Sequence, residues 1–206
     1  MLRTAIACVL TLTASARADI DWATGLVTAP GIGLADRQAP NPAVARGPAR
    51  RRAEDSARAA LAKALPAMPL AGGGTLADKL GDATVKARVD AAVAGALGVT
   101  ADPETDGSWK VTMAVPVEAV RQALVGPRPL GPTGDGGPAV VIVEGVTAAP
   151  AIGMTIGGLA AATIWTKELP SWTKGAPRVK ARKVAGAAID ADVGKATAAT
   201  LFVLVR

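Results

Sequence analysis

Apolar residues recur at three- and four-residue spacing over residues 41–65, the longest stretch of the chain with one consistent pattern. Asn41 can cap a helix start, and Pro42 suits the first helical position. The pattern predicts an amphipathic helix, in which the pair Gly47-Pro48 either kinks the first turns or delays the regular start to Pro48. Its buried stripe is mostly alanine, so whatever packs against it must come close. The stripe consists of Ala53, Ala57, Ala60, Leu61, Ala64 and Leu65.

Two further helices are predicted, over residues 75–94 with a break at Gly81 and over residues 116–125. Strands are predicted where apolar and polar residues alternate or where apolar residues run together. Asp106-Gly107 is the expected tight turn of a hairpin, and residues 178–184 read as one exposed strand. The predicted strands cover residues 19–34, 96–100, 108–115, 139–146, 162–166, 178–184 and 200–205.

These elements predict a mixed α/β (α+β) protein with two helices packed on a small, mostly antiparallel sheet, followed by a smaller β-rich half. The expected N-terminal α/β domain covers residues 19–125 and the β-rich region residues 139–206. A Gly/Pro-rich linker without periodicity, residues 126–138, separates them. The length of 206 residues, half of them apolar, is sufficient for this arrangement.

Residues 1–18 resemble a signal peptide, because a basic Arg3 precedes an apolar run over residues 5–12 and an A-x-A cleavage site at residues 16–18. Cleavage before Asp19 leaves 21 basic and 17 acidic residues, so the net charge falls from +6 to +4. We expect an exported protein of the periplasm or cell envelope. Lipid attachment at Cys8 is the alternative, although the apolar stretch before it is short. No later run is long enough to predict a membrane span.

Composition argues against most catalytic chemistry. The chain has no histidine, and its single cysteine, Cys8, leaves with the signal peptide. No serine lies in a nucleophile elbow, and the usual nitrogen and sulfur ligands of zinc are absent from the mature chain, so we expect a non-enzymatic protein without a cofactor. Asp190 and Asp192 keep open the alternative of a periplasmic, carboxylate-dependent hydrolase or carbohydrate-acting enzyme.

The segment Asp102-x-Glu104-x-Asp106-Gly107 begins like a calcium-binding loop. Its twelfth position is Met113 rather than a bidentate carboxylate, and Pro103 lies between the first two ligands. An ordinary acidic hairpin turn is therefore favoured.

Two groups of residues are candidates for partner binding. Trp165 and Trp172 flank a proline-broken loop and either fill the C-terminal core or form an aromatic anchor. Arg50, Arg51 and Arg52 either line a solvated helix face or contact an acidic partner or a membrane surface. Nucleic acid is not expected as a partner of an exported protein.

The chain resembles the bacterial lipoprotein-20 family of small envelope proteins, which is related to the N-terminal domain of the flagellar assembly protein T. The resemblance covers residues 22–116. It is carried by Asn41-Pro42-Ala43-x-Ala45-Arg46, Val85-Lys86-Ala87-Arg88-Val89 and Asp106-Gly107-x-Trp109-x-Val111-Thr112-Met113-x-Val115-Pro116. It implies an α/β domain with a structural or assembly role in the envelope and no active site. The chain departs from the family in lacking a credible lipidation cysteine and in carrying Gly47-Pro48 inside the helix.

Together these observations predict an exported, non-enzymatic envelope protein that acts through protein–protein interaction. The hydrolase is the first alternative, and a carrier of small apolar ligands is the second. A pocket lined by converging acids would favour the enzyme, whereas a closed core with apolar surface patches would favour the binding protein.

Overall fold

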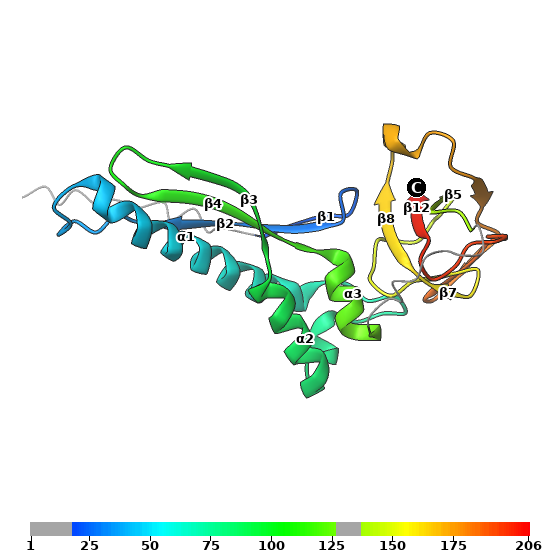
Figure 1. The fold of residues 1–206 in the computed structure, drawn as a ribbon. Coiled ribbons are helices and arrows are strands. Elements are labelled where there is room, and N and C mark those ends of the chain that lie inside the picture. Colours follow the sequence, from blue (N-terminus) through cyan, green and yellow to red (C-terminus); the bar gives the residue numbers. More distant parts are fainter. Residues whose placement is uncertain (1–17, 127–136) are drawn as a thin grey trace, which may run out of the picture.

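The structure, a computed structural model, describes residues 18–126 and 137–206 (Figure 1). It confirms the mixed α/β class, with helices packed against an antiparallel sheet in the first half and a smaller β-rich second half. The predicted linker lies almost wholly outside the described residues, as does the predicted signal peptide. We call residues 18–126 the arm, and residues 137–206 the lobe.

The elongated part of the arm consists of one long helix on one four-stranded antiparallel sheet. The sheet has the order β1-β2-β4-β3, with β1 at Asp19–Asp21, β2 at Leu26–Gly33, β4 at Trp109–Pro116 and β3 at Leu97–Pro103. Helix α1 (Pro42–Ala64) lies along β2 and β4. The predicted hairpin is confirmed, since β3 and β4 pair in antiparallel register and Gly107 has a positive φ of 89° in the turn between them.

Helix α1 begins at Pro42 and continues through Pro48, so the expectation of a start delayed to Pro48 is wrong. The side chain of Asn41 accepts a hydrogen bond from the backbone N–H of Val44 at 3.1 Å and thereby caps the first turn. Pro48 lies inside the helix, in its second turn, where its missing N–H removes one i→i−4 hydrogen bond without ending the helix.

The buried stripe of α1 follows a strict four-residue repeat and begins earlier than the sequence pattern indicated. It consists of Ala45, Ala49, Ala53, Ala57 and Leu61. Opposite it lie two glycines of β2: a Cβ on Gly33 would sit 1.8 Å from the carbonyl oxygen of Ala49, and one on Gly31 would sit 2.1 Å from that of Ala53. Helix backbone and strand backbone therefore touch directly.

The predicted second helix is split. A short 3-10 helix, η2 (Leu76–Lys79), is followed by α2 (Ala83–Ala94), and the break lies at Gly81 and Asp82. The Asp82 carboxylate accepts hydrogen bonds from the backbone N–H groups of Thr84 and Val85 at 2.7 and 3.2 Å, which starts a new helix. The third predicted helix is confirmed as α3 (Val117–Val125), and η1 (Leu65–Ala67) ends α1.

The lobe contains two four-stranded sheets. One has the order β8-β12-β5-β9 with all its pairs parallel, and the other has the order β10-β11-β6-β7. The predicted single strand over residues 178–184 is in fact two strands on different sheets, because the chain turns from one sheet edge to the other after Lys180. The strands are β5 (Val140–Glu144), β6 (Thr155–Ile156), β7 (Leu159–Ala160), β8 (Ala162–Thr166), β9 (Arg178–Lys180), β10 (Lys183–Ala185), β11 (Ala188–Asp190) and β12 (Leu201–Val205).

The arm and the lobe each have their own apolar cluster, and backbone hydrogen bonds join the two parts. The backbone N–H of Trp165 donates to the carbonyl of Trp22 at 2.9 Å, and that of Ala71 donates to the carbonyl of Ile152 at 2.8 Å. Ile152 packs in the cluster of the arm, while Trp22 packs against both clusters. The lobe is therefore joined to the base of the arm, and the far end of the arm projects away from it (Figure 1).

We predict that Gly33→Ala destabilises the protein by at least about 3 kcal/mol, the upper end of usual overpacking costs, because backbone atoms cannot move aside for the methyl group. Gly47→Ala is the matched control on α1, where a Cβ meets nothing within 4 Å. It should stabilise the helix by about 0.5–1 kcal/mol. Urea unfolding of both variants measures the two effects. Equal unfolding midpoints for Gly33→Ala and the wild-type protein would contradict the close approach of α1 and β2.

Candidate protein-binding surface

The two predicted tryptophans have different environments. Trp165 belongs to β8 and is only 3% exposed within the apolar cluster of the lobe, whereas Trp172 is 54% exposed in the 3-10 helix η3 (Ser171–Thr173). Of the two interpretations left open, core filling therefore applies to Trp165 and not to Trp172. Of the pair, only Trp172 is exposed enough to contact a partner.

The three predicted arginines also have different roles. Arg50 stacks over the ring of Trp109 at 5.3 Å and pairs with Glu54 at 3.0 Å. Arg52 donates to the carbonyl oxygen of Leu34 at 2.7 Å and so ties the loop after β2 to α1. Arg51 is exposed and forms no ion pair within residues 18–126 and 137–206. Arg50 and Arg52 therefore make contacts within the arm. The three arginines lie on α1 and Trp172 lies on the lobe, so these residues do not form one binding surface.

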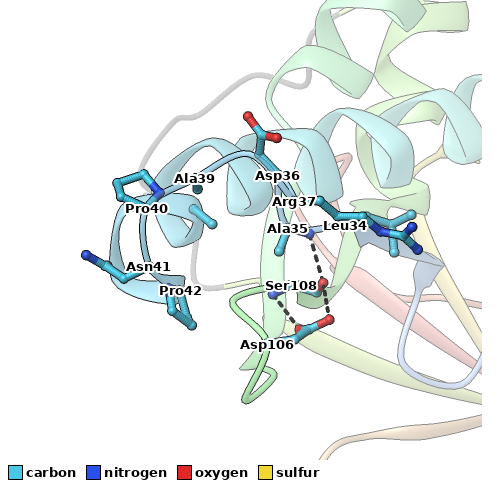
Figure 2. Close-up of a pocket in the computed structure, with 11 residues that line it drawn as sticks. Leu34, Ala35, Asp36, Arg37, Ala39, Pro40, Asn41, Pro42, Asp106 and Ser108 are labelled. Atoms are coloured by element: carbon cyan, nitrogen blue, oxygen red, sulfur yellow. Dashed lines mark hydrogen bonds between the residues drawn. The ribbon is translucent and has the colours of Figure 1, made fainter.

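A hollow of about 520 Å³ lies at the tip of the arm (Figure 2). Its wall is the loop of residues 34–42, closed on one side by the hairpin turn that carries Asp106 and Ser108. The Ser108 hydroxyl accepts from the backbone N–H of Ala35 at 2.8 Å and donates to the Asp106 carboxylate at 3.0 Å, while the Ser108 backbone N–H donates to the same carboxylate at 2.8 Å. These bonds to the backbone N–H and hydroxyl of Ser108 hold the pKa of Asp106 below its ordinary value.

The hydrogen bonds of Ser108 at the tip hollow fix two loops to each other. The Ser108 hydroxyl is occupied by its two bonds, and the chain has no histidine that could activate it. Sequence reasoning did not identify this network, although a Ser two residues after an Asp in a turn is a recognisable signal for one. The hollow can fix two loops and receive a small part of a partner, but it contains no nucleophile–base pair.

The acidic segment forms the end of β3 and the turn between β3 and β4. Glu104 pairs with Lys110 at 2.6 Å, and Asp106 is occupied by Ser108. No group of three or more side chains that could hold a metal ion occurs in the part of the chain that the structure describes.

The carboxylates proposed for the alternative enzyme lie on the lobe surface. Asp190 and Asp192 are both exposed, and Asp192 lies 3.6 Å from Arg182. Neither lines the tip hollow or the groove between α2 and α3. That groove has a volume of about 430 Å³. It is lined by alanines, among them Ala91 and Ala119, and by Arg88 and Gln122. It is a surface groove, whereas a carrier of small apolar ligands buries most of its cargo.

A feature that sequence reasoning missed is the side of the sheet turned away from α1. Residues on β2 and β4 alternate between the two faces: Val27, Ala29, Val111, Met113 and Val115 are buried on the helix side. The opposite side carries Ile32, in register with Lys110, and Leu97, in register with Ala114. Within the described residues, α1, α2 and α3 do not lie on this open sheet face (Figure 1), although Ala114 on it is buried, at 1% exposure.

Large apolar side chains are exposed on and around the open sheet face. Ile32 is 52% exposed, Leu97 is 55% exposed and Leu34, just beyond the end of β2, is 70% exposed. Val99 on the edge strand β3 is exposed as well. The signal that could have revealed this face is the presence of apolar residues at both alternating positions of residues 26–34, since a strand with one solvated face carries polar residues at every second position.

Comparison with known protein families and with curated proteins finds no match to this chain. The resemblance to the lipoprotein-20 family therefore stays a prediction. Within the described residues, no helix has the length and apolar character needed to cross a membrane.

We predict that Trp165→Ala and Trp172→Ala have very different effects on stability. Loss of a buried tryptophan costs about 3–5 kcal/mol, whereas truncation of an exposed one changes stability by about 0.5 kcal/mol or less. Urea unfolding followed by circular dichroism compares them. Similar destabilisation by both variants would show that Trp172 is also part of the core.

We predict a pH-dependent contribution of Asp106 to stability. Because its folded pKa lies below the unfolded value of about 3.9, its contribution is present above that pH and is lost as the pH falls through the folded pKa. Asp106→Asn should unfold at lower urea than the wild-type protein at pH 7, and the gap should close towards pH 3. The pKa values of Asp21 and Asp82 are also lowered, but both residues are present in the wild-type protein and in the variant. The difference in stability between the two proteins at each pH therefore reports on Asp106. A gap of constant size between pH 7 and pH 3 would contradict this role.

Proposed function

We propose that the protein is an exported, non-enzymatic component of the cell envelope that binds another protein through the open sheet face of the arm. The observation that carries this proposal is a sheet with a helix on one side only and large apolar side chains half exposed on the other. Ile32 and Leu97 lie at different places along this face, in register with Lys110 and Ala114, and with Leu34 they give it the exposed apolar character that supports a docking role. Export is proposed from the signal-like residues 1–18.

The charges of the arm indicate what kind of partner fits. Residues 18–126 carry 12 basic and 12 acidic residues and are therefore neutral overall. On the open sheet face, Lys110 is paired with Glu104 at 2.6 Å, and Glu104, with a smaller effect of Asp102, raises the pKa of Lys110. A face whose charges are already neutralised attracts no strongly charged partner. An apolar, nearly uncharged protein surface suits it best.

The rigidity of the arm supports the same role. The direct contact of Gly31 and Gly33 with the α1 backbone holds the sheet against a helix of 23 residues. Arg52 and Ser108 fix the loop at the tip. A surface that is ordered before binding loses little conformational entropy on association. The arm therefore presents its open face as a preformed platform.

Strand β3 contributes its face rather than its free edge. Its pairing with β4 is interrupted by a bulge between Gly98 and Thr100, and Pro103 near its end has no N–H to donate. Both features oppose the addition of a further strand. The proposed contact is therefore face to face.

The test is site-specific photo-crosslinking in intact cells. A photoreactive residue at position 32 or 97 should yield the same discrete adduct, whereas one at Ala87, exposed on α2, should not. The double variant Ile32→Asp/Leu97→Asp should abolish the adduct formed from a third position on the face, Thr100, without lowering the melting temperature, since both side chains are half exposed.

Three outcomes would contradict the proposal. Absence of adducts from positions 32 and 97, or an equal adduct from position 87, would remove the open sheet face as the contact. An adduct with twice the mass of the protein would assign the face to self-association and overturn the proposal of a different partner.

A further inference from the structure

The net positive charge of the described residues lies entirely in the lobe. Residues 18–126 are neutral, whereas residues 137–206 carry eight basic and four acidic residues, a net charge of +4. An imbalance of this kind between two halves of one chain indicates that they face different surroundings. The proposed protein contact of the arm does not account for the charge of the lobe.

Much of this charge lies in one continuous stretch, residues 167–183, which we call the basic segment. It contains six basic residues and a single acid, Glu168. The chain passes here from β8 through η3 to β9 and β10, which are edge strands of the two sheets. The basic residues are Lys167, Lys174, Arg178, Lys180, Arg182 and Lys183, and all six are exposed.

The fold turns the basic side chains outward. Val179, Ala181 and Val184 alternate with them and pack against the apolar cluster of the lobe. Arg178 pairs with Glu144 at 3.1 Å and Arg182 with Asp192 at 3.6 Å. Lys180 and Lys183 form no ion pair within the described parts of the chain and are free to meet an external anion.

Trp172 lies in the same segment, in the 3-10 helix η3, next to a turn closed by two side-chain hydrogen bonds. The buried Thr173 hydroxyl donates to the carbonyl of Pro170 at 2.7 Å, and the buried Thr166 hydroxyl accepts from the backbone N–H of Glu168 at 3.1 Å. These bonds fix the turn, so that Trp172 is held 54% exposed between Lys167 and Lys174 in the sequence. Figure 1 shows this turn, in orange, projecting beyond the carboxyl end of β8.

We propose that the basic segment binds the surface of an anionic phospholipid bilayer, with Trp172 in the headgroup region and the lysines near lipid phosphates. Tryptophan favours the membrane–water interface, because its ring is apolar and its N–H is polar. Lysine and arginine side chains reach anionic headgroups through long apolar stems. An exposed aromatic ring on a segment that carries six exposed cations fits a planar anionic surface, whereas an acidic peptide would be expected to lie in a groove.

This contact differs from the one considered for Arg50, Arg51 and Arg52. Two of those arginines are engaged within the arm, and the arm is neutral. The basic segment combines free lysines with an exposed tryptophan. Membrane binding by the lobe would leave the open sheet face of the arm available to its protein partner, so the two contacts can be tested separately.

The experiment uses the chain from Asp19 to Arg206, which contains every described helix and strand. Flotation with vesicles of phosphatidylcholine and phosphatidylglycerol should recover the protein, and vesicles of phosphatidylcholine alone should not. Raising the salt from 50 to 300 mM should weaken binding at least tenfold, since the attraction is electrostatic. Brominated lipid should quench tryptophan fluorescence, and Trp172→Phe should remove that quenching.

Matched charge reversals locate the surface. Lys180→Glu/Lys183→Glu should lower vesicle affinity at least tenfold, whereas Arg46→Glu/Arg51→Glu on α1, which changes the net charge equally, should lower it less than twofold. All four side chains are exposed, and unchanged melting temperatures verify that the variants fold.

Equal losses from the two double variants would show attraction to net charge alone and would overturn the assignment to the basic segment. Absence of binding to anionic vesicles would overturn the proposal directly. Binding of soluble polyglutamate by the basic segment without vesicle binding would identify an acidic macromolecule instead.

Discussion

The backbone contact between α1 and β2 is the constraint on which the arm depends. Gly31 and Gly33 have no side chains, and Ala49, Ala53 and Ala57 have the smallest ones, so helix and strand meet at their main chains. Small side chains bury little apolar area, so this interface gains its stability from many close van der Waals contacts. The same closeness makes it intolerant of a single added methyl group.

That contact also decides which surfaces are free. Because α1 lies along one side of β2 and β4, the larger apolar side chains of β4 are buried beneath it, and Ile32 and Leu97 remain on the open side. The lobe is joined to the base of the arm through Trp22, Ala71 and Ile152, and it leaves the tip uncovered. In the proposed arrangement, a neutral arm contacts a protein and a basic lobe contacts a lipid surface. The division of charge between the two halves of the chain is consistent with it.

The elements could be predicted well where local signals were strong. The cap at Asn41, the turn at Gly107 and the alternation over residues 108–115 all act within a few residues, and the structure contains the corresponding helix and hairpin. The predicted strands were wrong where contacts with segments distant in the sequence determined the structure. Residues 178–184 have one uniform pattern, yet they form two strands, because Ala181 bonds to Glu144 of one sheet and Arg182 to Asp190 of the other. Of the candidate site residues, Trp165 and Trp172 could not be told apart from the sequence for a similar reason, since pairing of β8 with β12 puts the ring of Trp165 in the core.

The sequence by itself determined the mixed α/β class, the alanine stripe, the lack of histidine and the concentration of basic residues in the second half, because composition and short-range periodicity are properties of the chain alone. Only the tertiary structure decided which apolar residues are buried. Ile32 and Val27 belong to the same strand and have similar hydrophobicity, but α1 covers Val27 and leaves Ile32 exposed. It likewise separated Trp165 from Trp172 and assigned Arg50 and Arg52 to internal contacts. Burial depends on which distant segment packs against a residue, and that information is not contained in the residue's own neighbourhood along the chain.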